Sequence, residues 1–404
     1  MQTQSKKQKI SYSPVIIFGD SITALGVING LKSLNIDIYI VSDDGSGIAT
    51  RSKHVKGILN LDIKEDNYVE KIISWINMNF TDKPTLMIAG NDDALIMLSK
   101  EYDLIYDVAI PTFPSWNTVN LIINKELINK FAEERDIPVI KTNRIDSAEE
   151  LDKFFFDNQD LSFPIFLKCV YSRQFSKKFK TKGVICHSKS EVYAAYKKFD
   201  GFMNALLLQD YIPGDIDQLS AVLLVLDKDS KVIAAAANNK IRSSHLYGPT
   251  TLSSSMWNQK MVQDAVLLAE SIGYKGFVGV QFKYDERDNT YKFLEINGRF
   301  SVSVSLAQRC GINMSKLVYK DFNGLAYNRF SVIEQTYEDN ILLWMPFSDL
   351  RLLFQKRFYR KPIYYLSALL GNGYIIEPFK LTDIRPLTFF IRTNIAKIFS
   401  RLRK

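Results

Sequence analysis

The sequence has few of the residues that build disulfide frameworks or histidine-rich metal centres. It contains three histidines and only three cysteines, which are Cys169, Cys186 and Cys310. An odd and scattered set of cysteines argues against a disulfide framework and against a zinc site. The scarcity of histidine likewise argues against histidine-rich metal chemistry.

Long apolar runs are also missing. No run approaches the roughly 18 apolar residues that mark a transmembrane helix. The first thirteen residues, MQTQSKKQKISYS, are polar and lack the apolar core that a signal peptide needs. No internal repeat of 20–50 residues is visible, which argues against a solenoid. We therefore expect a cytoplasmic enzyme.

What is present is the composition of a globular protein with an uneven charge. The 404 residues are 46% hydrophobic and 24% charged, which predicts two or three domains. Residues 341–404 hold 12 Lys and Arg against three acids, a net charge of +9 in a chain whose total is +8. The stretch Leu387–Lys404 combines aromatic, aliphatic and basic residues at helical spacing. This pattern suits either an anionic membrane surface or a helical layer packed on the rest of the protein, and no nucleic-acid-binding motif accompanies the charge.

The first region has the pattern of a parallel α/β sheet. A buried strand over 14–18, a helix over 23–34 and a second strand over 36–41 form a βαβ unit. Asp43 lies where a ribose-binding acid would sit, but the glycine spacing differs from G-x-G-x-x-G. We therefore expect a Rossmann-like scaffold, with an NAD-dependent enzyme as a weaker alternative. A further strand ends before Asn91, and either Asn91 or Asp92 could cap the next helix through a side-chain oxygen.

The most informative stretch is a predicted hairpin near residue 290. Its outgoing strand begins at Gly276, a polar turn covers 285–290, and the return strand ends at Asn297. Strand alternation places Gly279, Gln281 and Lys283 on one face of the outgoing strand. It likewise places Phe293, Glu295 and Asn297 on one face of the return strand.

A register that pairs Gln281 with Glu295 would gather side-chain oxygens from Gln281, Glu295 and Asn297. Mg²⁺ prefers oxygen ligands and is usually held by one or two carboxylates together with substrate phosphates. Arg299 follows directly and offers a fork for a phosphoryl group or a carboxylate. The alternative is that these are solvent-facing residues of an ordinary hairpin.

The segment KFLEINGRF resembles the metal-binding E-x-N-x-R signature of the ATP-grasp superfamily. The longer FKYDERDNTYKFLEIN is similar to its carboxylate–amine ligases, such as D-aspartate ligases, and to the large subunit of carbamoyl-phosphate synthase. Two departures are Gln281, where the commonest form has an acid, and Gly298, where a proline is usual. The resemblance covers residues 14–322 and implies that Gln281, Glu295 and Asn297 bind the metal.

The same resemblance assigns the residues that would bind ATP. Lys168 lies in an apolar strand, where a buried ammonium needs a counter-charge such as a phosphate. A basic segment over 171–183 replaces the usual glycine-rich flap, and the hinge over 206–217 would lie along adenine. We prefer Asp217 to Asp215 for the ribose. The predicted ATP contacts are Lys125, Lys168, Lys182, Gln209, Asp210, Tyr211, Ile212 and Asp217.

Further positions are implied for the transferring group and the second substrate. Arg242, in the segment NKIR, and Arg299 would steady the acyl phosphate. Asp92 and Asp93 would contact substrate from the first region. The polar loop over 248–255 suits an acceptor pocket or a plain connection.

We therefore expect an α/β protein with an α+β ATP-grasp part. Its predicted units are a Rossmann-like domain (1–118), an ATP-grasp domain (119–322) and a basic, mainly helical region (323–404). The ATP-grasp domain divides into 119–205 with the flap and 206–322 with the metal site. The resemblance implies a ligase that uses ATP and Mg²⁺ or Mn²⁺ and forms an amide through an acyl phosphate. Its acceptor would be a small amine or a cell-envelope precursor.

Other readings stay open. They are carbamoyl-phosphate-type activation of a small carboxylate and a non-catalytic nucleotide-binding protein. A homodimer and contact of the basic C-terminus with the inner membrane surface are further options, and no nucleic-acid partner is expected.

Overall fold

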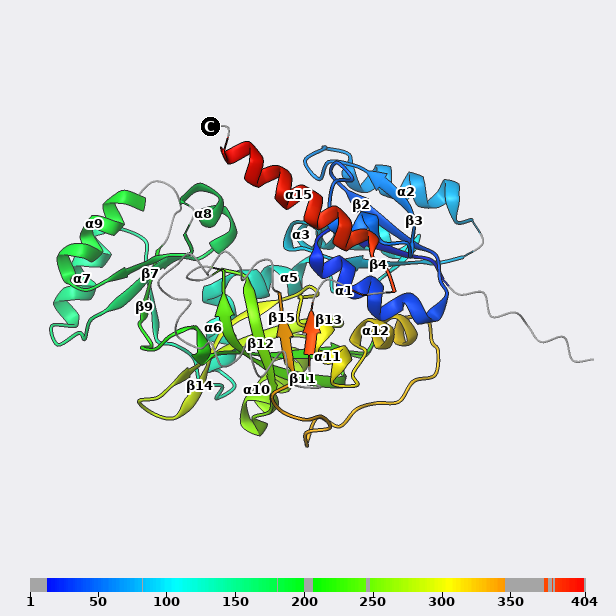
Figure 1. The fold of residues 1–404 in the computed structure, drawn as a ribbon. Coiled ribbons are helices and arrows are strands. Elements are labelled where there is room, and N and C mark those ends of the chain that lie inside the picture. Colours follow the sequence, from blue (N-terminus) through cyan, green and yellow to red (C-terminus); the bar gives the residue numbers. More distant parts are fainter. Residues whose placement is uncertain are drawn as a thin grey trace, which may run out of the picture.

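The computed structural model describes residues 13–81, 83–179, 181–199, 206–244, 248–345, 374–376, 380 and 382–402. Three sheets organise these residues (Figure 1). The first is a five-stranded parallel sheet at the N-terminus, the second a small four-stranded sheet, and the third a seven-stranded sheet whose strands come from the second half of the chain.

The N-terminal sheet has the order β3-β2-β1-β4-β5. Its order reverses between β1 and β4, and ligands of such sheets bind at the carboxyl ends of the strands on either side of the reversal. Ser21 and Asn91 cap the two helices that follow these strands. The elements are β1 (Val15–Phe18), α1 (Ile22–Leu31), η1 (Lys32–Leu34), β2 (Ile38–Ser42), η2 (Ile48–Arg51), β3 (Val55–Asn60), α2 (Tyr68–Asn79), β4 (Thr85–Ala89), α3 (Asp92–Lys100), α4 (Tyr102–Tyr106) and β5 (Ala109–Pro111).

The small sheet has the order β6-β9-β7-β8 and is antiparallel throughout. Helices α7 and α9 bury their apolar sides against it, with Leu151 and Val192 in the core. Its elements follow α5 (Trp116–Ile123) and are α6 (Lys125–Glu133), β6 (Thr142–Ile145), α7 (Ala148–Asp157), β7 (Ile165–Cys169), α8 (Ser172–Phe179), β8 (Val184–Cys186), α9 (Lys189–Phe199) and β9 (Leu206–Asp210).

The large sheet has the order β14-β13-β10-β11-β12-β15-β16. One face packs against α10, and part of the other face packs against α1 of the N-terminal domain together with α12. Its elements are η3 (Ile216–Gln218), β10 (Leu219–Leu226), β11 (Val232–Ser243), β12 (Thr250–Met256), α10 (Gln259–Ser271), β13 (Gly276–Asp285), β14 (Thr290–Asn297), α11 (Val304–Arg309), α12 (Met314–Phe322), β15 (Leu342–Trp344) and β16 (Tyr374–Ile376).

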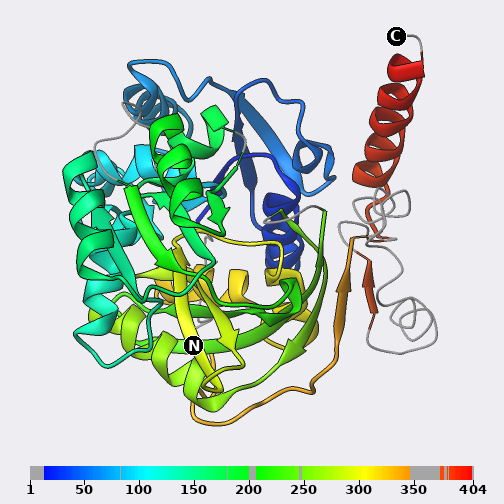
Figure 2. The same cartoon turned by 90° about the vertical axis from the view of Figure 1, so that its left-hand side faces the viewer.

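The described part of the C-terminal region is not wholly helical. Strands β15 and β16 extend the large sheet, and α15 (Arg385–Leu402) then stands to one side of the molecule (Figure 2). Just before the helix begins, Asp383 accepts hydrogen bonds from the Ser52 hydroxyl at 2.6 Å and the Lys53 amide at 2.9 Å. The C-terminal segment is thereby fixed to the N-terminal domain.

Two local expectations were wrong, and one segment has a structure that the sequence left open. The segment expected as a polar loop over 248–255 is mostly strand β12, whose serines lie between β11 and β15. The basic segment that replaces the glycine-rich flap contains helix α8. Phe293 does not share a face with Glu295, because Leu294 is an extra residue in a β-bulge that shifts the alternation by one.

Candidate active site

Beside the hinge strand β9 lies a cavity of about 310 Å³, which we call the hinge cavity. The small sheet and the large sheet form its opposite walls. Ile140, Phe166, Ile185 and Leu294 make an apolar region, and lysines and Glu295 gather elsewhere on the wall. A flat apolar group and an anionic group could therefore bind side by side.

Glu295 lies among three lysines. Its carboxylate is 2.8 Å from Lys125 Nζ and 3.7 Å from Lys182 Nζ. These two ammonium groups hold the pKa of Glu295 well below its usual range. Lys168, only 3% exposed, donates to Gln209 Oε1 at 2.9 Å. Burial, and then the charge of Lys125, lower the pKa of Lys168 well below its ordinary value. The lysines outnumber the carboxylate, so this end of the cavity favours a polyanion.

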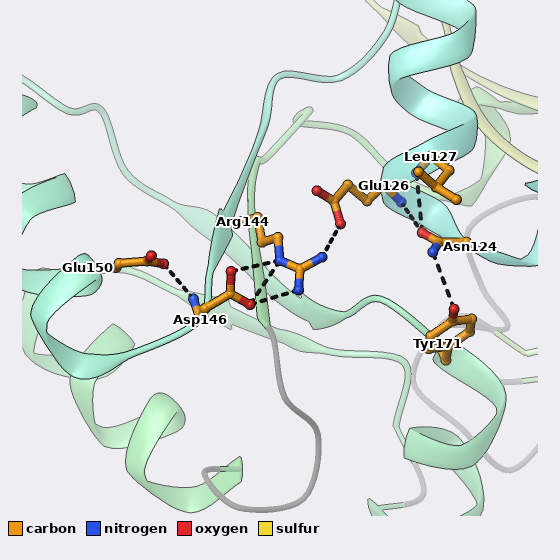
Figure 3. Close-up of polar contacts among 7 residues, drawn as sticks. All are labelled: Asn124, Glu126, Leu127, Arg144, Asp146, Glu150 and Tyr171. Carbon is orange, nitrogen blue, oxygen red and sulfur yellow. Dashed lines mark hydrogen bonds and ion pairs between the residues drawn. The ribbon is translucent and has the colours of Figure 1, made fainter.

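Lys125 is the first residue of α6, and Figure 3 shows the side-chain contacts of its neighbours at the start of this helix. Asn124 caps the helix through the amides of residues 126 and 127, and its carboxamide donates to Tyr171 at 3.3 Å beside α8. Arg144 on β6 connects Glu126 at 2.5 Å with Asp146 at 2.8 Å. The first turn of α6 is thus fixed from both sides.

The predicted pairing of Gln281 with Glu295 is present in the β13–β14 register. Asn297 pairs with Gly279, one step further along the hairpin. All three predicted metal residues line one continuous wall, with Gln281 and Glu295 in the hinge cavity and all three in the neighbouring cavity described below. Because of the bulge, Leu294 also reaches the hinge cavity while Phe293 is fully buried in the core beneath α10.

The four predicted hinge residues lie together on the wall of one cavity. Gln209, Asp210, Tyr211 and Ile212 all line the hinge cavity. Gln209 also donates to the Thr142 hydroxyl at 2.9 Å, which fixes its carboxamide. Of the two acids considered for a ribose, Asp215 lines this cavity, and Asp217 is not among its lining residues.

A second cavity of about 550 Å³ lies between the N-terminal domain and the large sheet, and we call it the interdomain cavity. The carboxyl ends of β1 and β4 form one side of it. Arg299 crosses this space and binds Asp92 through two nitrogens, at 3.1 and 3.3 Å. The predicted residues Asp92 and Arg299 are therefore brought together, whereas Asp93 and Arg242 are not among the lining residues of either cavity.

Two lysines line the hinge cavity without having been assigned a role from the sequence. Lys240 lines both cavities and donates to the Gly248 carbonyl at 2.8 Å. Burial, and then the charge of Lys182, lower its pKa to about 8. Lys283 donates to the Ile212 carbonyl at 2.7 Å beside the hinge. Strand alternation from Gln281 would have found Lys283, and the bulges between β11 and β12 explain why Lys240, and not Arg242, faces the cavity.

The described residues contain no group of three or more His, Cys, Asp or Glu that could hold a metal ion. Within the same part of the chain, no helix is long and apolar enough to cross a membrane.

Comparisons with known proteins agree with this architecture. Residues 203–339 match a family model described as "ATP-grasp in the biosynthetic pathway with Ter operon". A D-aspartate ligase of Enterococcus faecium is 26% identical over 308 residues, which cover 70% of this chain and 69% of the relative.

Solved structures extend the likeness. N5-carboxyaminoimidazole synthetase from Staphylococcus aureus, complexed with ADP, superposes with a TM-score of 0.62 at 10% identity and covers 81% of this chain and 82% of its own. Biotin carboxylase from Campylobacter jejuni, in a complex with β-γ-ATP, superposes with a TM-score of 0.61 at 16% identity. The match covers 78% of this chain and 72% of the carboxylase chain. The resemblance to ATP-grasp ligases inferred from the sequence is confirmed, and the chain has their fold. The predicted enzyme class, an ADP-forming ligase of the ATP-grasp type, is confirmed as well.

Proposed function

We propose that this protein joins a carboxylate to an amine with ATP, through an acyl phosphate, and releases ADP and phosphate. ATP would bind in the hinge cavity, with its base against the hinge and its phosphates among the lysines. The acid to be activated would bind in the interdomain cavity.

One observation carries the proposal: the two cavities share a wall. Lys182, Leu219, Lys240, Gln281 and Glu295 line both. A terminal phosphate held by these residues would lie next to a carboxylate in the interdomain cavity. Phosphoryl transfer depends chiefly on such positioning and on electrostatic stabilisation.

The residues present fit a magnesium ion. Glu295 is ionised, because its lysine neighbours depress its pKa, and Gln281 and Asn297 add neutral oxygens from the same hairpin. Lys125 now neutralises Glu295 and would turn to a phosphate oxygen in the complex. When bound, Mg²⁺ or Mn²⁺ would supply positive charge that offsets the charge of the transferring group.

The remaining steps rest on this chain's own side chains. Lys125, Lys168 and Lys182 would hold phosphate oxygens, and Lys240 would neutralise the acyl phosphate formed at the shared wall. Arg299, positioned by Asp92, would orient the carboxylate that attacks the terminal phosphorus. The amine then attacks the acyl carbon and phosphate leaves, and exclusion of water by the N-terminal domain would limit hydrolysis.

The relative from Enterococcus faecium suggests the acid. We propose a small amino acid as the carboxylate substrate, with aspartate as the first compound to test. The amine would be a larger acceptor, such as a cell-envelope precursor, that enters from the open side of the interdomain cavity.

The test is ADP release from magnesium-ATP in the presence of amino-acid pools, with hydroxylamine as a trap for the acyl phosphate. Wild type should form hydroxamate in one pool. Glu295→Gln should reduce this rate by about a hundredfold or more. Glu65→Gln, which makes the same change in an ion pair with Lys71 that lines neither cavity, is the matched control and should retain most activity. Failure of the wild type to bind ATP would contradict the proposal.

We further propose that α15 places the enzyme on an anionic membrane surface. Residues 385–404 contain six Lys and Arg and no acid. The guanidinium of Arg51 lies 4.6 Å from the Phe389 ring centre, which identifies the side of α15 that faces the protein. Ile391 is about 200° around the helix from Phe389 and is 37% exposed, and Ile384 is 56% exposed. A basic helix with an outward apolar side is typical of membrane-surface helices.

Co-sedimentation with vesicles tests this location. The full-length protein should bind phosphatidylglycerol vesicles at low salt and phosphatidylcholine vesicles weakly. Ile391→Asp and Arg392→Glu should each weaken binding, whereas the same charge change at exposed Lys153, on α7 beside the small sheet, should not. Equal binding by all variants would refute the assignment. Light scattering of the same samples would test the expected homodimer.

A further inference from the structure

Asn238 is an unexplained polar residue in the interdomain cavity. It lies in the middle of the large sheet, is only 5% exposed and lines the cavity wall. Its Oδ1 has no hydrogen-bond partner among the described residues. Buried side-chain oxygens are nearly always paired, so an unpaired one calls for a partner that binds there.

The sheet register places Asn238 relative to the shared wall. Gln281 pairs with Ala221, and Ala221 pairs with Asn238 on the next strand. Asn238 therefore lies two strands from Gln281, a distance of about 10 Å between their backbones. The small side chain of Ala221 leaves the floor between them open, and Ala221 itself lines the cavity. A small molecule lying over Ala221 would reach the shared wall with one end and Asn238 with the other.

The unpaired oxygen of Asn238 indicates which chemical group the end of the molecule beside it would carry. A carboxamide oxygen without a donor fits a group that carries N–H bonds, such as an ammonium. Ser301, also on the wall of this cavity, has an unpaired hydroxyl oxygen and is a second acceptor there. Lys182 and Lys240 lie on the shared wall, where they would attract the carboxylate of an amino acid. The ammonium of the same molecule would then lie at the opposite end of the cavity floor, beside Asn238.

We propose that Asn238 and Ser301 form a subsite for the amino group of the acid that is activated. This inference rests on the proposed ligase function and assigns the selection of amino acids over simple carboxylic acids to Asn238.

The chain offers a matched control in the next residue. Asn239 also has an unpaired, buried Oδ1. It lies on the opposite face of β11, the face that Ala237 buries in the core beneath α10, and does not line the cavity. If an unpaired oxygen in this strand mattered only for stability, substitutions at the two positions would have similar effects.

The experiment compares each amino acid with its deaminated analogue, as aspartate with succinate and glutamate with glutarate. The readout is the ratio of kcat/KM values for ADP release. Wild type should prefer the amino acid by about tenfold or more, because a partner lost from a buried polar group costs at least that. Asn238→Leu should reduce the ratio to below about threefold, with the KM for ATP unchanged. Asn238→Asp keeps an acceptor oxygen and should preserve the preference, as should Asn239→Ala.

The inference is overturned if Asn238→Leu keeps the preference, if Asn239→Ala loses it equally, or if wild type does not distinguish the two acids. If wild type releases no ADP with any acid, the ligase proposal fails first. Calorimetric titration of the same acids into the ADP-loaded protein then decides the subsite separately. The subsite is supported if wild type binds the amino acids more tightly than their deaminated analogues and Asn238→Leu abolishes this preference. It is refuted if wild type binds both kinds of acid equally well.

Discussion

Replacement of Lys240 by methionine should stabilise the protein near neutral pH when nucleotide and metal have been removed. Lys240 carries a partly buried ammonium, and its pKa is lowered by the cation of Lys182 and raised by the carboxylate of Glu295. Burial dominates, so its pKa falls from 10.5 to about 8. Methionine fills a similar volume without a charge to desolvate.

The size of the effect follows from the pKa difference. A drop of 2.5 units at about 1.36 kcal/mol per unit corresponds to about 3 kcal/mol. Below pH 8 the lysine is charged in both the folded and the unfolded states, so the whole penalty applies. Between pH 8 and 10.5 the unfolded state binds the proton and the folded state does not, so stability rises with pH. Above 10.5 the penalty is absent.

Urea unfolding of wild type, Lys240→Met and Lys240→Arg at pH 7, 8, 9 and 10 would measure this. Arginine stays charged throughout, so it gives a reference that retains the penalty. Between pH 7 and pH 10 the difference in free energy of unfolding between wild type and Lys240→Met should shrink by about 2.5 kcal/mol. Over the same range wild type should gain a similar amount of stability relative to Lys240→Arg.

The reasoning would be refuted if the differences in free energy of unfolding between wild type and the two variants stayed constant within about 1 kcal/mol from pH 7 to pH 10. They would show that the ammonium of Lys240 is solvated or paired in the folded protein.

Three further outcomes are expected. Lys168→Met should keep or raise the melting temperature of the free protein, but at ATP equal to 100 times the wild-type Kd, a thirtyfold loss of affinity would reduce the ligand stabilisation from about 2.7 to about 0.9 kcal/mol in a thermal-shift assay. Gly276→Ala should cost about 3 kcal/mol or more in urea unfolding, because its φ is +78° and the new Cβ would lie 2.0 Å from the Thr112 carbonyl oxygen. Gly311→Ala, with φ +89° and nothing within 4 Å, should cost about 1–2 kcal/mol, and equal losses would contradict the steric argument. Asp383→Ala should speed hydrogen exchange in α15 without changing exchange in β1 or β4, and unchanged protection of α15 would show that other contacts hold it.

The local sequence pattern was sufficient to predict the structure where the strands alternate regularly. The β13–β14 hairpin has the pairing of Gln281 with Glu295 that its turn position and apolar spacing predict. The buried strand around Lys168 and the cap at Asn91 are present for the same reason, since each depends on a few neighbouring residues. These local features predicted the pairing of the proposed metal residues and the strand that carries most of the hinge residues.

Irregularities in the strands explain what the sequence could not provide. A single extra residue, Leu294, turns Phe293 into the core, and no composition signal marks a bulge there. Irregular pairing beyond Lys240 brings this lysine, and not Arg242, to the cavity. The role of Asn238 depends on three strands in register, a long-range relation that one strand's sequence does not contain.

The wall shared by the two cavities has a thermodynamic consequence. Because Lys182, Lys240 and Glu295 face both spaces, a polyanion in one changes the charge that an acid meets in the other. The two affinities must then be linked by a single factor: whatever ATP does to the dissociation constant of the acid, the acid does to that of ATP. Neutralised lysines would attract the acid less, whereas a freed Glu295 with its metal would attract it more. The sign of the linkage therefore reports which charge dominates at the wall, and it decides whether the two proposed substrates strengthen or weaken each other's binding.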